Sequence, residues 1–521
     1  MNLRTLLLLA AAFPLAAHAE LRLPAIVGDH MVLQRDQADP IWGWDNPGTN
    51  VTVEFAGQKK SAKAGADGKW TVKLDAMPAN AKPQDMTITG SSARTLKDIL
   101  VGEVWVCSGQ SNMGFNVGSC WDADLEIASA KHPNLRLVSV PNVGTQEIQD
   151  DFKGQWERCT PENVGQFTAV GFFYGRLLHQ ILDVPVGLID NAWGGSSAEA
   201  WVRRDVLEND KRFTTLMDQW KNTEATYDFA KVQAAHVKAM DAWKVKAAEA
   251  KKAGKPAPAA PRAPRNSLTG QHRPGNLYAG CLHPIIGYGI RGAIWYQGES
   301  NSGRAYEYAY LFPLMIQHWR DEWKQGDFPF YWVQLADFQA EVAEPGDSTW
   351  AELRESQTKT MEKLKSTGQA VITDLGEAND IHPKNKRDVA ERLARWALVK
   401  DYGMKIPYRS PEYKSVAIQG GKAIVTLDTF GDKLRTVDVS EVRGFAICGA
   451  DKKWVWADAK IVGTDKVEVS SASVKEPVAV RYAWANNPVC NLFSATGLPV
   501  TPFRTDDFPM TTKPVETAST K

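Results

Sequence analysis

The spacing of hydrophobic and polar positions differs between the two ends of the chain and its middle. In "NVTVEFAG", Val51, Val53 and Phe55 face one side of a strand, and the polar residues between them face the other. Such an alternation is typical of a strand with one buried face. It recurs after residue 407 in "KAIVTL", "KWVWAD", "DKVEVSS" and "EPVAVRYAW". The pattern therefore predicts a β module of sandwich type at each end.

The middle of the chain has continuous apolar runs separated by stretches of helical period, such as "GFFYGRLLHQIL" and "AYLFPLMIQHWRDEW". Apolar strands that alternate with helices indicate a parallel sheet covered on both faces. Ligands of such sheets bind in the loops at the carboxyl ends of the strands. The predicted strands are "VWVC", Leu135–Val140, Val186–Ile189, Arg291–Tyr296, Pro329–Leu335 and Ala370–Thr373.

One segment, from about residue 207 to 275, interrupts this alternation. Residues 209–252 are rich in Lys, Ala, Glu and Gln at helical spacing, and the Pro-Ala stretch "KAGKPAPAAPRAPRNSLTG" follows them. We expect a solvated insertion, a helical hairpin with an extended return. The predicted organisation is a signal peptide at 1–19, a β module at 20–100, an α/β domain at 101–406, a β module at 407–510 and a tail at 511–521.

The first residues have the three parts of a signal peptide. Arg4 precedes an apolar run at 6–15, and the small-x-small site Ala17-His18-Ala19 follows. That run is too short to cross a bilayer, and no later segment of the sequence is suited to a membrane span. We expect an exported protein, periplasmic or secreted.

Composition narrows the possible partners. The chain has 61 basic and 61 acidic residues, a balance that argues against broad binding to nucleic acid or to an anionic membrane. Six cysteines permit disulfides after export, but their spacing determines no pairing. Without a CxxC pair, a thiolate zinc site is not expected, and we predict neither metal nor cofactor. The 19 tryptophans suit both a core and sugar rings.

Small and polar residues follow the predicted strand in "GEVWVCSGQSNMGF", and they include two serines, Ser108 and Ser111. Ser111 is the candidate nucleophile. Serine needs a base and an oxyanion site before it can act as a nucleophile. Among nine histidines, His382 is favoured because it lies just past a strand and before an amphipathic helix. The others lie in the signal peptide (His18), the first β module (His30), helices (His179, His318), the insertion (His236, His272) or segments before strands (His132, His283).

Two further loops supply hydrogen-bond donors. "LIDNAWGGSSAEAW" contains Gly194-Gly195, where backbone N–H groups can approach a ligand closely. "AIWYQGESN" contains Gln297, whose amide can face a developing negative charge. We predict an oxyanion hole made by the N–H groups of Ser111 and Gly195 and the Gln297 amide. Two rival nucleophiles, Ser196 and Ser197, also follow glycines but form no GxSxG elbow.

These motifs resemble the sequence blocks of SGNH-type (GDSL-like) hydrolases. The blocks are "GQSNM" at 109–113, Asn191 with Gly194-Gly195, "WYQGESN" and "DIHP", and they are most similar to the sialate O-acetylesterase group of carbohydrate esterases. The likeness runs from about residue 23 to 508 and includes "GLPVTPFRTDDFP". It implies a three-layer α/β/α catalytic domain with a mostly parallel sheet. It also implies metal-free removal of O-acetyl groups from sugars, and terminal β modules that could pack together as one accessory unit.

The resemblance also implies roles for single residues. Ser111 would be the nucleophile and His382 the general base, while Gly195 and Gln297 match the oxyanion donors. The superfamily favours an Asp three residues before the His, but this chain has Asn379 there. Asp380 is therefore the predicted acid, with Asp374 or a backbone carbonyl as alternatives. Asn112 and Glu299 are expected to shape their loops.

Two other functions fit parts of the pattern. A lipase or thioesterase on the same sheet would need an apolar acyl groove, and it would prefer octanoyl to acetyl esters. A secreted glycan-binding protein with an inactive hydrolase core would bind sugars without turnover. The sequence makes no prediction of oligomeric state.

The acetylated sugar is also left open. The carboxylate of a sialic acid would suit an arginine, whereas neutral acetylated xylan or xyloglucan would suit aromatic platforms. The candidates beside the motif loops are Arg203, Arg204 and Arg304 for a carboxylate, and Trp193, Trp201 and Trp295 for a neutral sugar.

Overall fold

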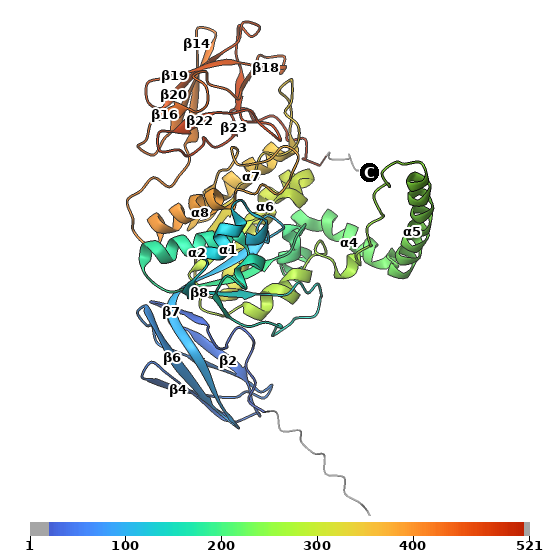
Figure 1. Cartoon of the computed structure of the whole chain (residues 1–521). Coiled ribbons are helices and arrows are strands. Elements are labelled where there is room, and N and C mark those ends of the chain that lie inside the picture. Colours follow the sequence, from blue (N-terminus) through green and yellow to red (C-terminus); the bar gives the residue numbers. More distant parts are fainter. Residues whose placement is uncertain (1–19, 515–521) are drawn as a thin grey trace, which may run out of the picture.

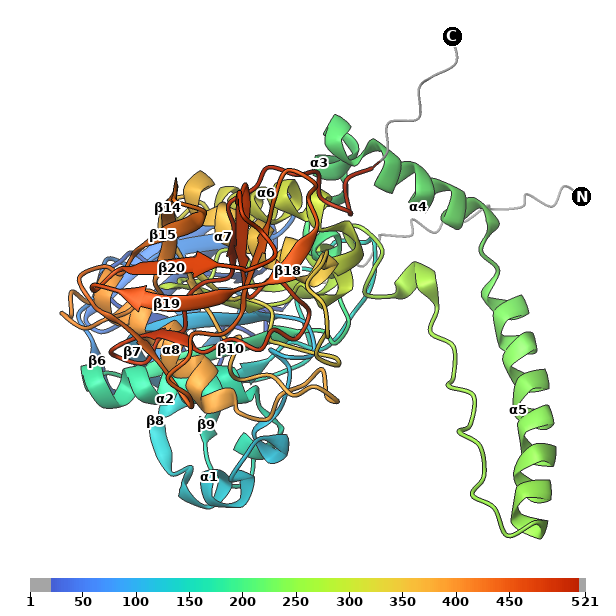
Figure 2. The ribbon, with the colours of Figure 1, turned by 90° about the horizontal axis from the view of Figure 1, so that it is seen from above.

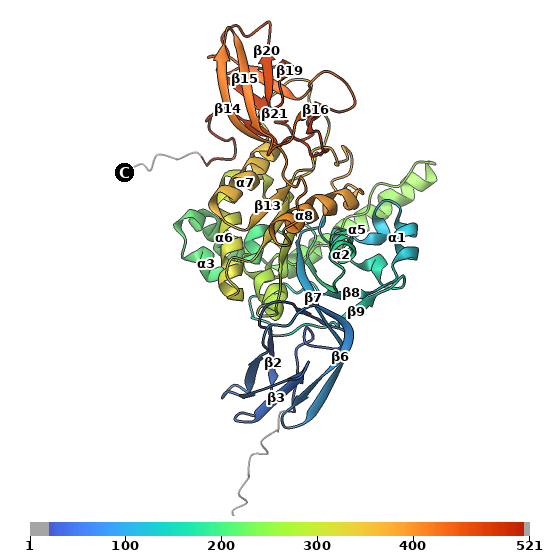
Figure 3. The same cartoon turned by 90° about the vertical axis from the view of Figure 1, so that its left-hand side faces the viewer.

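The computed structural model describes residues 20–514 (Figure 1). The predicted signal peptide at 1–19 and the last residues of the predicted tail lie outside the described residues. Figures 1 and 3 show an N-terminal β module at one end, a central α/β body and a C-terminal β module at the other end. The two β modules therefore do not form one accessory unit, because the central body separates them.

A mixed α/β body with additional β sheets confirms the coarse fold prediction. Its central strands run in the order β13-β12-β11-β7-β10-β8-β9. The first six of these pair in parallel, and β9 pairs with β8 in antiparallel fashion. Their bounds are β7 (Ala93–Gly109), β8 (His132–Ser139), β9 (Glu157–Cys159), β10 (Val186–Ala192), β11 (Gly292–Tyr296), β12 (Phe330–Val333) and β13 (Thr367–Ala370).

The central strands are buried on both faces, which explains their continuous apolar sequences. In β7, Val104 and Val106 belong to one core cluster, and Trp105 and Cys107 belong to the other. One face packs on α6 (Ala305–Trp323) and α7 (Thr349–Lys363), and the other packs on α2 (Ala169–Leu182) and α8 (Lys386–Lys400). Each fully buried valine or phenylalanine contributes roughly 1.5–3 kcal/mol to stability.

The N-terminal module continues into the central sheet through one long strand. The first part of β7 pairs with β6 in antiparallel fashion, and its second part pairs with β10 and β11 in parallel. The predicted boundary between residues 100 and 101 falls inside β7, so no linker separates the two units. The other strands are β1 (Val32–Gln34), β2 (Pro40–Trp44), β3 (Asn50–Phe55), β4 (Gln58–Lys63), β5 (Lys69–Lys73) and β6 (Asn80–Thr89).

The C-terminal module has its own core between two four-stranded sheets. It is anchored to α7, since Arg504 makes a double ion pair with Glu355 and Arg354 donates to the Ala485 carbonyl at 2.7 Å. Its strands are β14 (Glu412–Gln419), β15 (Lys422–Asp428), β16 (Leu434–Thr436), β17 (Phe445–Cys448), β18 (Trp454–Trp456), β19 (Asp458–Val462), β20 (Lys466–Ser470), β21 (Ala479–Tyr482), β22 (Leu492–Ser494) and β23 (Phe503–Arg504).

The insertion forms an arm rather than a pair of packed helices. α3 (Arg204–Glu208) and α4 (Thr214–Thr226) lead into α5 (Phe229–Lys252), which extends away from the body with an extended return beside it (Figure 2). Trp243 Nε1 donates to the Pro258 carbonyl at 2.7 Å and holds this return. The expected hairpin therefore consists of one helix and an extended segment that returns beside it. α5 buries no residue, and even its Val237 and Val245 side chains are exposed to solvent.

Three further observations concern the described residues. None of the helices there is long and apolar enough to cross a membrane. All six cysteines are free, and five of them are buried. No group of three or more His, Cys, Asp or Glu side chains between residues 20 and 514 is arranged to hold a metal ion.

Candidate active site

Three loops begin at one level of the central sheet. Ala192 at the end of β10 and Tyr296 at the end of β11 both pair with Gly109, the last residue of β7. Gly109 has a φ of +138°, and a Cβ there would lie 2.3 Å from the Tyr296 carbonyl oxygen. Only glycine fits this close approach. The "GQSNM", "WGGSS" and "QGESN" loops therefore start together at the edge where ligands of parallel sheets bind.

Ser111 and His382 meet at this edge. The Ser111 Oγ lies 2.8 Å from Nε2 of His382, although 271 residues separate them in sequence. Ser111 lies two residues after the end of β7, and His382 lies in the loop between β13 and α8. Ser111 is half-buried, and 36% of the His382 side chain is exposed, so a ligand can reach both. This pair has the geometry of a nucleophile and its general base.

Several groups determine the electrostatics of the imidazole. The His382 ring stacks on Phe115 with 6.3 Å between ring centroids and 23° between planes. Burial, followed by the charge of Lys386, lowers the pKa of His382 below its ordinary value, and the carboxylate of Asp380 opposes this shift. The ring therefore stays neutral, and able to accept a proton, at neutral pH.

The two candidate acids have different positions. Asp380 Oδ1 accepts a hydrogen bond from the backbone N–H of His382 at 2.9 Å and lies 3.6 Å from Nδ1 of the ring, beyond hydrogen-bond distance. Asp374 makes a double ion pair with Arg392, with both N–O distances 2.6 Å. Both oxygens of Asp374 thus face Arg392, whereas Asp380 is the carboxylate that lies near the imidazole.

The glycine pair of the second loop lies against Ser111. A Cβ on Gly194 would lie 3.5 Å from Cβ of Ser111. Gly195 has a φ of +73°, in the left-handed region that favours glycine, and its carbonyl accepts a hydrogen bond from Ser300 Oγ at 2.9 Å. Between residues 20 and 514, the backbone N–H groups of Ser111 and Gly195 find no protein acceptor. Both are free to donate to a ligand.

Gln297 does not have the role expected of it. Its buried Nε2 donates to the Ser196 carbonyl at 3.0 Å and to Asn301 Oδ1 at 2.7 Å, and its Oε1 accepts from Tyr308. A side-chain amide has two N–H hydrogens, and both are used here. The prediction that Gln297 donates to an oxyanion is therefore wrong. Gln297 instead joins its own loop to the "WGGSS" loop.

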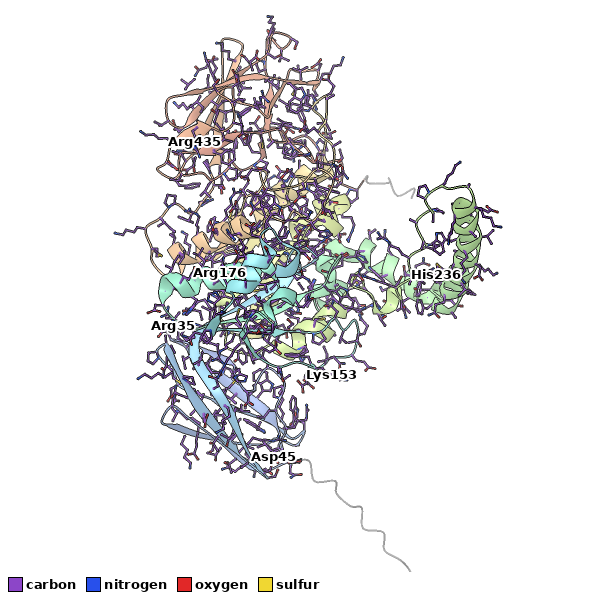
Figure 4. The ribbon with its side chains drawn as sticks, in the orientation of Figure 1. Arg35, Asp45, Lys153, Arg176, His236 and Arg435 are labelled. Atoms are coloured by element: carbon purple, nitrogen blue, oxygen red, sulfur yellow. The ribbon has the colours of Figure 1, made fainter. Side chains whose placement is uncertain are left out.

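A second serine–histidine pair lies near the first. Ser197 Oγ is 2.8 Å from Nδ1 of His272, and the backbone N–H of Ser197 donates to the carbonyl of Gln271. The sequence did not predict this pair, because Ser197 and His272 are 75 residues apart and share no motif. His272 lies at the end of the insertion that returns to the body, where it meets Ser197. His236 lies on α5, out on the arm (Figure 4). Ser197 itself is buried, unlike Ser111.

Asn112 and Glu299 shape their loops as expected. Asn112 Nδ2 donates to Glu299 Oε1 at 2.6 Å and to the carbonyl of Ile381 at 3.0 Å. Lys386 is the third side chain of this hydrogen-bonded group. It is fully buried, and its Nζ donates to Asn112 Oδ1 at 2.6 Å. The sequence did not indicate this role of Lys386, because in "HPKNKRD" it resembles an ordinary surface lysine at the start of a helix.

Most of the predicted sugar-binding residues are engaged elsewhere. Trp201 and Trp295 are fully buried and pack edge to face with 5.9 Å between ring centroids, so neither offers a platform to a sugar. Trp193 is only half-buried. The arginines are ion-paired: Arg203 with Asp205 and Glu322, Arg204 with Glu208 and Glu224, and Arg304 with Glu199 and Glu307. The assignments of Trp201 and Trp295 are wrong because both rings are withdrawn from solvent. Arg203 and Arg304 keep 42% and 34% of their side chains exposed, but carboxylates of this chain already pair with their guanidinium groups.

A different tryptophan is open to solvent beside the His382 loop. Trp121 is 57% exposed, and its backbone N–H donates to the carbonyl of Lys384 at 3.2 Å. With Phe173 and Arg387 it lines a surface pocket of about 220 Å³. An exposed indole face of this kind suits a sugar ring.

Comparison with known proteins places the chain in a family. The profile described as "Carbohydrate esterase, sialic acid-specific acetylesterase" matches residues 101–240 and 274–398, just over half of the chain. The unmatched interval contains the outer half of α5 and its return. All the motif loops lie inside the matched ranges.

Individual relatives agree with this match. The chain is 28% identical over 556 residues to the sialate O-acetylesterase of Mus musculus, covering 95% of this chain and 96% of that one. It is 28% identical to the sialate O-acetylesterase of Homo sapiens, covering 92% of each. A solved carbohydrate acetylesterase from Xanthomonas citri is 37% identical with a TM-score of 0.79, covering 94% of this chain and 100% of that one. The chain thus belongs to the carbohydrate esterase family of sialic acid-specific acetylesterases, and it is an esterase.

Proposed function

We propose that this esterase removes O-acetyl groups from carbohydrates through an acetyl-enzyme, with Ser111 as nucleophile and His382 as general base. The observation that carries the proposal is the 2.8 Å contact between Ser111 Oγ and His382 Nε2 at an accessible strand edge. Family membership supplies the reaction class. The parallel strands with helices on both faces support an SGNH-type α/β/α catalytic domain, and the first 19 residues support export.

In the first step, Ser111 Oγ attacks the acetyl carbonyl carbon while His382 Nε2 accepts the hydroxyl proton. The carbonyl oxygen becomes an oxyanion next to the free N–H groups of Ser111 and Gly195. The bond between the carbonyl carbon and the sugar oxygen then breaks, and His382 returns the proton to the leaving sugar hydroxyl. The Asp380 carboxylate, 3.6 Å from Nδ1, stabilises the transient imidazolium by charge.

In the second step, water replaces the sugar hydroxyl. His382 accepts a proton from the water as its oxygen attacks the acetyl carbonyl, and the same N–H groups face the second oxyanion. The bond to Ser111 Oγ breaks, Oγ regains its proton from His382, and acetate leaves. Neither step calls for a metal or a cofactor.

The acid side of the pH profile should report on His382. The lowered pKa of His382 leaves the base neutral around pH 7, so we expect kcat/KM to be level there. As pH falls through that pKa, the ring is protonated and kcat/KM should drop about tenfold per pH unit. The midpoint should lie below the ordinary histidine value of about 6.5. Steady-state hydrolysis of 4-nitrophenyl acetate between pH 4.5 and 8 measures this, and a flat profile would argue against His382 as base.

Neutral acetylated glycans are the substrates that the site supports best. Arg203 and Arg304 are ion-paired, and Arg387, which lies in the same pocket as Trp121, is ion-paired with Glu126. Trp121, by contrast, offers an exposed face next to the His382 loop. We therefore expect acetate release from acetylated xylan at least as fast as from O-acetylated sialic acid at equal concentration of acetyl groups. An enzymatic acetate assay on both substrates measures the two rates.

Two controls accompany this comparison. Trp121→Ala should raise KM for the glycan several-fold but leave turnover of 4-nitrophenyl acetate unchanged, because the small ester needs no sugar platform. An octanoyl ester should react more slowly than the acetyl ester, which distinguishes a lipase or thioesterase. Acetate release from sialic acid alone would overturn the preference for neutral glycans while leaving the acetyl-enzyme proposal intact.

A further inference from the structure

A chain of buried polar groups lies directly behind the Ser111–His382 pair. Lys386 Nζ donates to Asn112 Oδ1 at 2.6 Å, and Asn112 Nδ2 donates to Glu299 Oε1 at 2.6 Å. The same Nδ2 donates to the carbonyl of Ile381 at 3.0 Å. The amide of Asn112 thus lies between an ammonium and a carboxyl group and also holds the peptide that precedes His382. Its neighbours determine its orientation, since its oxygen faces the lysine and its nitrogen faces the acceptors.

Lys386 is an unusual residue to find inside a protein. It is fully buried at the start of α8, with Nζ 4.9 Å from the ring centroid of Phe115 and 5.1 Å from that of Tyr296. Burial lowers the pKa of its amine to about 7, against the opposing effect of nearby acidic groups. Burying a lysine costs several kcal/mol in general. A helix position that needed only packing would be filled better by an apolar residue.

Two connections lead from Lys386 to His382. The first is a chain of hydrogen bonds. Lys386 orients Asn112, and Asn112 donates to the Ile381 carbonyl, which belongs to the peptide bond between Ile381 and His382. The second passes through Phe115, whose ring both receives the Lys386 ammonium and stacks on the His382 imidazole. Lys386 also lowers the pKa of His382 through its charge.

We propose that Lys386 is a positioning residue for the esterase reaction, which holds the His382 peptide through Asn112 and places its positive charge against the Phe115 ring on which the imidazole stacks. This inference rests on the proposed function, because it takes His382 as the base. The pKa of His382 is lowered below its ordinary value, whereas that of the Lys386 amine is about 7, so the amine gains its positive charge as pH falls toward the range in which the imidazole titrates.

Other titratable groups face the same two residues. His382 is in contact with the Ser111 hydroxyl and is close to the Asp380 carboxylate. The groups that act on Lys386 come from three parts of the body: Glu299 after β11, Asp380 and Glu377 in the loop before α8, and the Cys120 thiol after Val117–Ser119. The carboxylates favour positive charge at this site, and Lys386 is the cation that opposes protonation of His382.

The test is the pH profile of kcat/KM for 4-nitrophenyl acetate in Lys386→Met. Removing the charge should move the acidic midpoint to higher pH by at least about half a unit. Loss of the orienting bond to Asn112 should lower the plateau of kcat about tenfold, with little change in KM. Lys386→Gln, which keeps a donor toward Asn112 without charge, should show the same shift of the midpoint with a smaller loss of kcat. It carries the test if the methionine variant does not fold.

Lys384→Met is the matched control. The Lys384 side chain is exposed and carries the same charge two residues before Lys386. Its removal should leave both the acidic midpoint of the pH profile and the plateau of kcat unchanged. A folded Lys386→Met or Lys386→Gln with the wild-type midpoint would overturn the inference, since a purely structural lysine would change the melting temperature only. A wild-type profile without an acidic limb would instead remove His382 as base, and this inference with it.

Discussion

Ser111→Ala should abolish ester hydrolysis. The substitution removes the attacking oxygen and leaves the backbone N–H groups in place, so we expect kcat for 4-nitrophenyl acetate to fall about 10⁴-fold or more. The fold should be unaffected, because Ser111 is half-buried and its hydroxyl contacts only His382 within residues 20–514. Initial rates, together with a thermal unfolding curve for each protein, measure both effects.

The chain offers a matched control in its other serine–histidine pair. Ser197 Oγ lies the same 2.8 Å from an imidazole nitrogen as Ser111 Oγ does, but Ser197 is buried. Ser197→Ala should lose roughly 1 kcal/mol of stability with its hydrogen bond and keep most of the turnover. Full activity in Ser111→Ala, together with loss in Ser197→Ala, would transfer the nucleophile to residue 197.

His382→Ala should have an effect of similar size. Without an acceptor 2.8 Å from Oγ, the hydroxyl keeps its proton and stays a weak nucleophile, so we expect kcat to fall by about 10⁴-fold or more. The acidic limb of the pH profile should disappear as well, because the titrating base is gone. Combining this variant with Ser111→Ala should cost little more than either alone, since the two residues act as a unit.

His272→Ala controls for the loss of any serine-bound imidazole near this edge. His272 hydrogen-bonds Ser197, whereas the histidine that hydrogen-bonds Ser111 is His382. We expect turnover and the acidic limb of the profile to persist in this variant. If His382→Ala kept its acidic limb and His272→Ala lost it, the base would be His272, and the proposed pairing would be wrong.

Most strands, and whether each is buried on one face or on both, could be predicted because this property depends on the residues of the strand itself. A strand buried on both faces must be apolar throughout, as "VWVC" and "GAIWY" are, and a strand with one wet face must alternate. The observed β13 (Thr367–Ala370) shares only Ala370 with the predicted strand Ala370–Thr373, so this prediction was displaced. The strand begins in small and polar residues that carry little apolar signal, and the apolar residues after Ala370 lie beyond its end. The insertion was recognisable for a similar reason, since a helix without an apolar stripe has no core to join.

Roles that depend on neighbours were not predictable in this way. Gln297 follows its strand as an oxyanion donor should, yet Ser196 and Asn301 take both of its hydrogens. Trp201 and Trp295 lie beside the motif loops in sequence but point into the core. The sequence gives a side chain's type and its approximate place, whereas exposure and hydrogen-bond partners depend on residues from other elements.

The amino-acid order is enough to show that small and polar residues follow three apolar strands, and that one histidine precedes a late helix. Those properties arise within short stretches, where period and residue type govern burial. The folded chain was needed to show that β7, β10 and β11 end at one level and that Ser111 meets His382 across 271 residues. It was also needed to show that Lys386 is buried behind them. Distance and burial are properties of the packed chain, because each depends on atoms that are remote in sequence.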